Sequence, residues 1–205
     1  MKCPHCQTSD LKPTLIEHSL PAMGCDTCHG SLVSLLYYRH WAETQKPAPA
    51  DAAQPPAAAM PAASASAVPA PAAAVPAAAA IPAAAAHSTD TTRAVMCPKC
   101  ARLMTKYKLA GGISNRVDVC NTCDEAWLDG GEWELLEALQ LNLTMPAIFT
   151  EAWQRRLRRE LSEDTRRSIL RRLVGDEGAA RVEEFRTYLA GSGHKSHILN
   201  YLYHD

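Results

Sequence analysis

Two Cys-x-x-Cys pairs in the middle of the chain constrain its fold more than any other feature. Nineteen residues separate Cys100 from Cys120, close to the spacing that is typical of four-cysteine zinc sites. Two residues between paired cysteines allow a tight turn that points both sulfurs at one ion, and four thiolates complete a closed, structural tetrahedral site. The spacing therefore predicts a structural Zn²⁺ site with the ligands Cys97, Cys100, Cys120 and Cys123.

The segment between these pairs predicts a β-hairpin. Apolar residues alternate with charged residues over 105–109 and again over 116–119, and residues 110–112 can form the turn. Alternation with a period of two is typical of half-buried strands. After the last cysteine, Asp129 is a candidate N-cap and Glu132 its capping-box partner, so a short helix should follow. We expect this helix to bury Leu135, Leu136 and Leu139. Together these elements make a zinc ribbon.

The same segment matches the family pattern CPxC…CxxCxGxWLDxGE. The matching residues are Cys97, Pro98, Cys100, Cys120, Cys123, Trp127, Leu128, Asp129, Gly131 and Glu132. On these residues the segment resembles the bacterial zinc-ribbon family named after transcription factor IIB. Glu125 stands where that family has glycine. The resemblance implies bound zinc and a ribbon fold far more firmly than it implies transcription.

The first 45 residues repeat this pattern. Eighteen residues separate Cys6 from Cys25, and the pair Cys25–Cys28 closely resembles the pair Cys120–Cys123. We interpret the repeat as an internal duplication, with a divergent first zinc ribbon over residues 1–45 and a second ribbon over residues 93–142. The ligands of the first ribbon are Cys3, Cys6, Cys25 and Cys28. We expect two structural Zn²⁺ ions per chain. Residues 31–41 should form a strand and a short helix that packs Leu35, Leu36, Tyr37 and Trp41.

Other cysteine chemistries fit the sequence less well. All eight cysteines lie in Cys-x-x-Cys pairs, and no apolar run follows Met1, so we expect a cytoplasmic protein with reduced thiols. Four pairs at ribbon spacing favour metal binding over thiol–disulfide exchange. A catalytic zinc would keep an open coordination position. Iron held by four thiolates stays open as a minor alternative. Because no triad, paired-carboxylate or phosphate-loop pattern occurs, we expect neither an enzyme nor a small-molecule substrate.

Residues 46–92 consist almost entirely of alanine and proline. Proline recurs every few residues and interrupts any helix that alanine would favour. We expect a disordered, partly polyproline linker, which leaves the two ribbons as separate units or joined only through a folded interface. The chain has no apolar stretch long enough to span a bilayer, so we expect no membrane partner.

Residues 143–205 predict a small all-α domain or a dimerising element. Thr144 or Thr150 could cap a first helix, Ser162 could begin a second, and Gly175 a third that ends at residues 191–193. The apolar residues expected to face inward are Ile148, Phe149, Trp153, Leu157, Leu161, Ile169, Leu170, Leu173, Val174, Val182, Phe185 and Leu189, with Ile198, Leu199 and Leu202 in a last helix. About sixty residues are marginal for independent stability, so packing on a ribbon or on a second chain is expected.

Positive charge is local in this chain. The formal net charge is −1, and it falls to about −5 when two zinc ions replace the protons of eight thiols. Lys106, Lys108 and Arg116 share one face of the second hairpin, and Arg155, Arg159 and Arg166 could line a face of the C-terminal helices. These six residues are candidate contacts for nucleic acid or a partner. Acidic residues at helical pairing distance also fit a merely solvated, salt-bridged surface.

The sequence thus predicts a small zinc-stabilised β protein with two ribbons, a linker and a C-terminal all-α domain. The leading functional hypothesis is a non-catalytic scaffold or adaptor that recognises a protein, or a second copy of itself, through the second ribbon and the C-terminal helices. The alternative is a transcription-associated zinc-ribbon protein that binds nucleic acid.

Overall fold

The computed structural model describes residues 1–17, 19–46, 83, 88–90 and 92–204. Most of the expected linker over residues 46–92 lies outside the described residues. The chain divides into two compact units, Met1–Leu157 and Arg158–Asp205. Residues 143–157, which the sequence grouped with the C-terminal helices, therefore belong to the unit that contains both ribbons.

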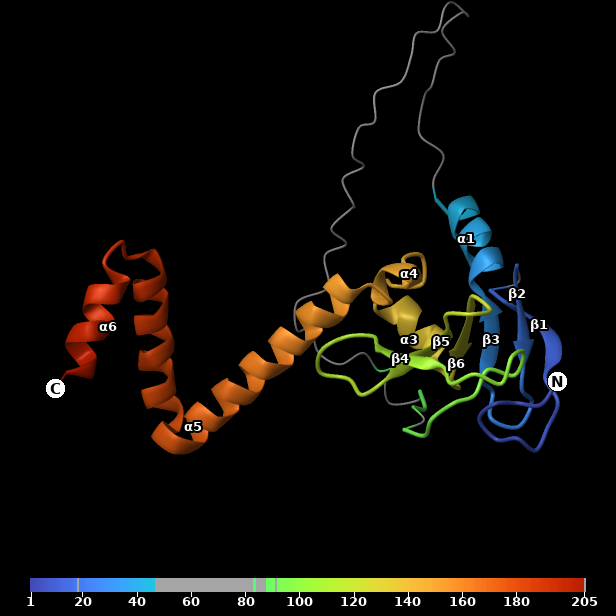
Figure 1. The fold of residues 1–205 in the computed structure, drawn as a ribbon, viewed down its shortest axis with the longest axis horizontal. Coiled ribbons are helices and arrows are strands. Elements are labelled where there is room, and N and C mark those ends of the chain that lie inside the picture. The colour runs from blue at the N-terminus through green and yellow to red at the C-terminus, as the bar shows by residue number, and fades with distance from the viewer. Residues whose placement is uncertain (18, 47–82, 84–87, 91, 205) are drawn as a thin grey trace, which may run out of the picture. The chain divides into compact units, whose positions relative to one another are not determined.

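A single six-stranded antiparallel sheet contains the strands of both ribbons (Figure 1). The strands are β1 (Lys12–Ile16), β2 (Leu20–Gly24), β3 (Ser31–Ser34), β4 (Thr105–Lys108), β5 (Arg116–Cys120) and β6 (Glu125–Leu128), and their order is β1-β2-β3-β6-β5-β4. The expected second hairpin is confirmed, because Lys106 pairs with Asp118 and Tyr107 with Val117. The two ribbons are joined where β3 pairs with β6.

An approximate two-fold axis relates the two ribbons within this sheet. Leu32 and Trp127 hold the same place after the last cysteine of their ribbons, and these two residues pair with each other across the joint. On either side of this pair, Val33 lies opposite Ala126 and Ser31 lies opposite Leu128. The duplication seen in the sequence therefore forms a symmetric joint within one chain.

Three short helices, together with Trp153 and Leu157 at the start of the helix that begins at Glu151, contribute to the main core on one face of the sheet. The three helices are α1 (Leu35–Thr44), α3 (Glu132–Ala138) and α4 (Met145–Ile148). The expected burial of Leu35, Leu135 and Leu136 is confirmed. The expected burial of Trp41 is also confirmed, but the expectation for Leu36 and Tyr37 is wrong. They are 66% and 58% exposed, because the helix turns Tyr38 inward instead. The other face holds a second cluster that contains Cys3, Cys25, Cys97, Cys120 and Trp127.

The start of α3 differs from the expectation. Gly131, with a φ of 81°, is the N-cap, and no side chain caps the helix. The prediction of Asp129 as N-cap is wrong, since its Oδ1 accepts a hydrogen bond of 2.8 Å from Nε1 of Trp127. Glu132 does play its expected part, because its Oε2 accepts a hydrogen bond of 2.9 Å from the backbone N–H of Asp129.

Two further helices follow, α5 (Glu151–Gly191) and α6 (Lys195–Tyr203). Thr150 caps α5, because its hydroxyl accepts a hydrogen bond of 3.3 Å from the N–H of Trp153. No helix begins at Ser162, where α5 is continuous, whereas the expected break at Gly175 is confirmed by its non-helical φ of 76° and ψ of 172°. Within the described residues, no helix is both long and apolar enough to cross a membrane.

Two four-cysteine clusters as candidate metal centres

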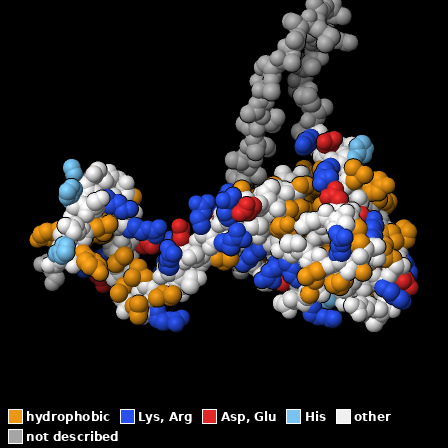
Figure 2. Space-filling model, viewed as in Figure 1, with side chains coloured by type: hydrophobic (Ala, Val, Ile, Leu, Met, Phe, Trp, Pro, Cys, Tyr) orange, Lys and Arg blue, Asp and Glu red, His pale blue; other side chains and the backbone are white. Residues whose placement is uncertain are grey.

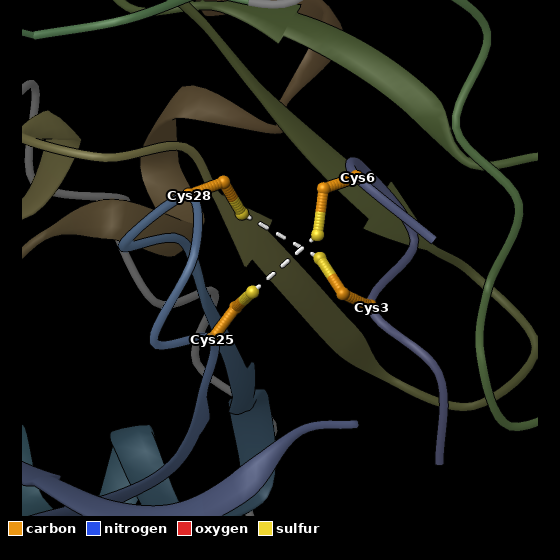
Figure 3. Close-up of side chains that lie close together, drawn as sticks. All are labelled: Cys3, Cys6, Cys25 and Cys28. Atoms are coloured by element: carbon orange, nitrogen blue, oxygen red, sulfur yellow. Dashed lines mark hydrogen bonds between the residues drawn. The ribbon is translucent and has the colours of Figure 1, made fainter. Parts of the chain in front are cut away.

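The four cysteines of the first ribbon converge on one point, as Figure 3 shows. Sγ of Cys3 lies 3.5 Å from Sγ of Cys28, and Sγ of Cys6 lies 3.6 Å from Sγ of Cys25. All four sulfurs lie within 4.8 Å of one another, and Cys3 and Cys25 are buried. One ligand pair precedes β1 and the other joins β2 to β3, so the sheet positions both.

The second ribbon gathers Cys97, Cys100, Cys120 and Cys123 in the same way. Sγ of Cys100 lies 3.6 Å from Sγ of Cys120. All eight cysteines are free thiols, and these separations far exceed a disulfide length of about 2.05 Å. In a tetrahedral zinc site with Zn–S distances of about 2.3 Å, the sulfurs lie about 3.8 Å apart. Each cluster therefore has the donor atoms, spacing and burial to hold a metal ion.

The same backbone turn forms all four cysteine pairs. In each pair, the residue directly after the second cysteine donates its N–H to the carbonyl of the first cysteine, over 2.8 to 3.1 Å. That residue also has a left-handed φ of 56° or 57°, which is uncommon for residues other than glycine. The four residues are Gln7, His29, Ala101 and Asp124. Strict repetition of this turn aims each pair of sulfurs toward the opposite pair.

The thiol pKa values differ strongly within each cluster. Hydrogen bonds from Thr8 and Ser9 lower the pKa of Cys6 to about 5, whereas burial raises the pKa of Cys28. The backbone N–H of Arg102 lowers the pKa of Cys100 to about 7, and the hydrogen bond with Cys100 raises the pKa of Cys123 to about 12. One thiolate in a cluster thus opposes ionisation of its neighbours. A divalent cation would supply the charge that lets all four sulfurs bind as thiolates.

Glu125, which replaces the glycine of the family pattern, leaves the second cluster intact. It begins β6 opposite Cys120 and is 3% exposed. Its carboxylate forms an ion pair with Lys99, which lies between Cys97 and Cys100. This ion pair therefore ties the first cysteine turn of the second ribbon to the sheet.

A largely buried carboxylate cluster lies beside the second hairpin, and little in the amino-acid pattern indicated it. Oxygens of Asp90, Asp129 and Glu132 lie within 4.8 Å of one another. Asp90 forms an ion pair of 3.0 Å with Arg116 and accepts the N–H of that residue. His5, from the first ribbon, approaches Asp129 to 3.7 Å. The cluster therefore joins segment 88–90, the second ribbon and the first. Only the Trp127–Glu132 motif, which places two acids near an indole, could have indicated it.

The candidate contact residues have mixed surroundings. The predicted face of Lys106, Lys108 and Arg116 is confirmed by the strand register. Lys106 forms an ion pair of 2.7 Å with Asp118, whose pKa burial raises to about 6. Burial also lowers the pKa of Lys108. Asp118 therefore offsets part of the positive charge of this face.

The three candidate arginines lie elsewhere, on α5. Arg155 pairs with Glu151 over 3.5 Å, and Arg159 and Arg166 are exposed. Figure 2 shows basic side chains spread along this helix. Their role in binding stays a prediction.

Comparison with known proteins gives no match: no family model, no curated protein and no solved structure is significantly similar to the chain. The functional argument therefore depends on the geometry of the chain itself.

Proposed function

We propose that this chain is a non-catalytic adaptor, held in shape by two structural zinc ions, that binds a protein partner or a second copy of itself. Zinc fits the two clusters because closed sets of four cysteine ligands are typical of structural zinc sites. The resemblance of residues 97–132 to the zinc ribbons named after transcription factor IIB also supports zinc as the metal.

The apolar surface of the unit Arg158–Asp205 carries the adaptor proposal. Leu173 is 75% exposed, Tyr188 62% and Leu202 54%, whereas Ala179 and Leu189 are buried in this unit. The sequence prediction of inward-facing residues is wrong, for the isolated chain, at six positions that are each at least 45% exposed: Ile169, Leu173, Val174, Val182, Leu199 and Leu202. Large apolar side chains exposed together on one unit are typical of interaction sites. Figure 2 shows the apolar side chains gathered over this unit.

The experiment measures the molar mass of the zinc-loaded full chain by light scattering, together with capture of partners from extract. A second copy or a defined partner should associate through this surface, and Leu173→Glu or Tyr188→Glu should weaken the association by at least about tenfold. Ser168→Glu is the matched control, because Ser168 is a polar, exposed residue of the same helix. A chain that stays monomeric and captures nothing specific would refute the adaptor.

Nucleic-acid binding is the second candidate, and the exposed arginines of α5 are the observation that favours it. Binding through phosphates weakens steeply as the salt concentration rises. If the candidate is correct, Arg159→Ala with Arg166→Ala should flatten the salt dependence of duplex or single-stranded DNA binding. Association with a protein that does not depend on salt concentration and is unaffected by these two substitutions would favour the adaptor instead.

A further inference from the structure

A pocket of about 400 Å³ opens on the first ribbon, on the same face of the sheet as Trp127. Apolar side chains from β1, β2, β3 and α1 form most of its lining, namely Pro13, Leu15, Pro21, Met23, Leu32 and Tyr37. Lys99 and Glu125, which pair with each other, line it as well. Its volume lies within the range of roughly 300–1,000 Å³ that is typical of ligand sites.

The two-fold axis through Leu32 and Trp127 gives this pocket a counterpart on the second ribbon. Counted from the cysteines, Pro21 and Met23 of β2 correspond to Arg116 and Asp118 of β5. In the same way, Ser34 corresponds to Asp129 and Tyr37 to Glu132. The lining of the pocket is therefore mainly apolar in the first ribbon and charged in the second.

A short piece of this chain fills the counterpart. The N–H of Thr89 donates to the carbonyl of Gly130 over 2.8 Å, and Nδ2 of Asn115 donates to the carbonyl of Thr89 over 3.0 Å. The carboxylate of Asp90 binds Arg116. The polar segment Ser88–Asp90 therefore matches the charged lining of the site that it covers, whereas no described segment of the chain covers the apolar pocket on the first ribbon.

We propose that the open pocket binds a short apolar peptide segment of a partner protein, in the place that Ser88–Asp90 takes on the second ribbon. This inference rests on the adaptor function proposed above and names one of its binding sites. A peptide is the expected occupant because a peptide covers the symmetry-related site. It should be apolar because Arg116 and Asp118 are replaced here by Pro21 and Met23, and because Lys99 already pairs with Glu125.

The test selects a random-peptide phage library on the zinc-loaded full chain and measures binding of the enriched peptides by fluorescence polarisation. Leu15 and Tyr37 are 59% and 58% exposed, so Leu15→Glu and Tyr37→Glu should leave the fold intact. Leu36→Glu is the matched control, because Leu36 is 66% exposed and adjacent to Tyr37 but does not line the pocket.

Enriched peptides should carry adjacent apolar residues and should bind both pocket variants at least about tenfold more weakly, with less than about a twofold effect of Leu36→Glu. Amide shifts on peptide binding should centre on residues 13–37. Failure to enrich apolar peptides, or equal binding to Leu15→Glu, would overturn the inference. Loss of self-association in Leu15→Glu would also overturn it, since a second copy would then be the occupant.

The proposed pocket and the proposed adaptor function can be distinguished by these measurements. Association that depends on Leu173 but comes without peptide binding would refute the pocket and leave the adaptor in place. Peptide binding without any association through Leu173 would support the pocket and limit the adaptor to the first ribbon.

Discussion

Gly30 of the first ribbon lies directly against the indole of Trp127 in the second. A Cβ atom built on Gly30 would lie 2.3 Å from Cζ2 of Trp127 and 2.9 Å from the carbonyl oxygen of Leu128. Trp127 is fully buried, so its ring has little room to move. The joint between the ribbons therefore depends on the absence of a side chain at one position.

We predict that Gly30→Ala weakens this joint. Overpacking a well-packed core costs about 1–3 kcal/mol, and the contact with a backbone oxygen places this change toward the upper end. Thermal or denaturant unfolding of the zinc-loaded chain measures the effect. Gly191→Ala is the control, because nothing lies within 4 Å of a Cβ built there. Equal midpoints for Gly30→Ala and the wild type would contradict the packing at the joint.

Loss of one metal ion should affect both ribbons. Cys100→Ser removes one ligand of the second cluster, so elemental analysis should find zinc at the first site alone. Structural zinc contributes on the order of 10 kcal/mol to small fingers, and β6, which borders the second cluster, pairs with β3. We therefore expect amide shifts and faster hydrogen exchange in residues 31–34 as well.

Thr122→Ala changes an exposed, non-ligand residue between Cys120 and Cys123, in the other cysteine turn of the same cluster; it is the control and should keep both ions. Unchanged spectra of the first ribbon in Cys100→Ser would show that the two ribbons are stable independently. Chelation of the wild type should unfold both ribbons together, as circular dichroism would record.

Tyr38 should contribute stability through its hydroxyl. It donates a hydrogen bond of 2.7 Å to the carbonyl of Asn142 and accepts one of 2.9 Å from the N–H of Met145. Tyr38→Phe leaves both groups without this partner, at a cost of about 1–3 kcal/mol. Tyr37→Phe, at an exposed neighbouring position, should change the free energy of unfolding by much less. Equal free energies of unfolding for the two variants would show that the hydroxyl of Tyr38 does not contribute to stability.

The carboxyl pair Glu17–Glu137 should make stability depend on pH. A hydrogen bond with Glu17 raises the pKa of Glu137 to about 7 from its ordinary value of 4.5. The folded state then binds more protons than the unfolded state between these values, so stability falls as the pH rises through this window. Glu137→Gln should reduce this slope and raise the free energy of unfolding at neutral pH, by less than about 1 kcal/mol because the pair is largely exposed.

Unfolding should be followed between about pH 6 and pH 7, the upper part of this window, where the cysteines are expected to stay bound to metal. Glu43→Gln, at an exposed glutamate of α1, is the control and should keep the slope of the wild type. A slope that persists in Glu137→Gln would place the titrating group elsewhere.

The ligand sets and hairpins could be predicted from the sequence because they are local. The spacing of the cysteines defined both clusters, and alternation around Tyr107 defined the second hairpin. The pairing of β3 with β6 could not be predicted in this way, because it joins segments that lie about a hundred positions apart. One feature of the sequence agrees with this pairing. Residues on both faces of the two strands are apolar, which is typical of central strands: Leu32-Val33 and Ala126-Trp127-Leu128.

In the C-terminal region, local sequence signals predicted one helix boundary wrongly and one correctly. Ser162 followed by two acids has the composition of a helix start, yet strong helix formers on both sides continue the helix through it. Gly175 did break the helix, because only glycine adopts its positive φ at low cost. Which apolar residues face inward could not be deduced, since a unit of this size leaves most of them without a partner in a single chain.

The pairing of β3 with β6 also fixes the separation of the two four-cysteine clusters independently of the residues that connect the ribbons. Because lengthening a connection raises the entropy of loop closure only slowly, residues 47–82 could change greatly in length without altering that separation. A binding partner that touches both ribbons would therefore meet the same arrangement of surfaces in long and short versions of this chain.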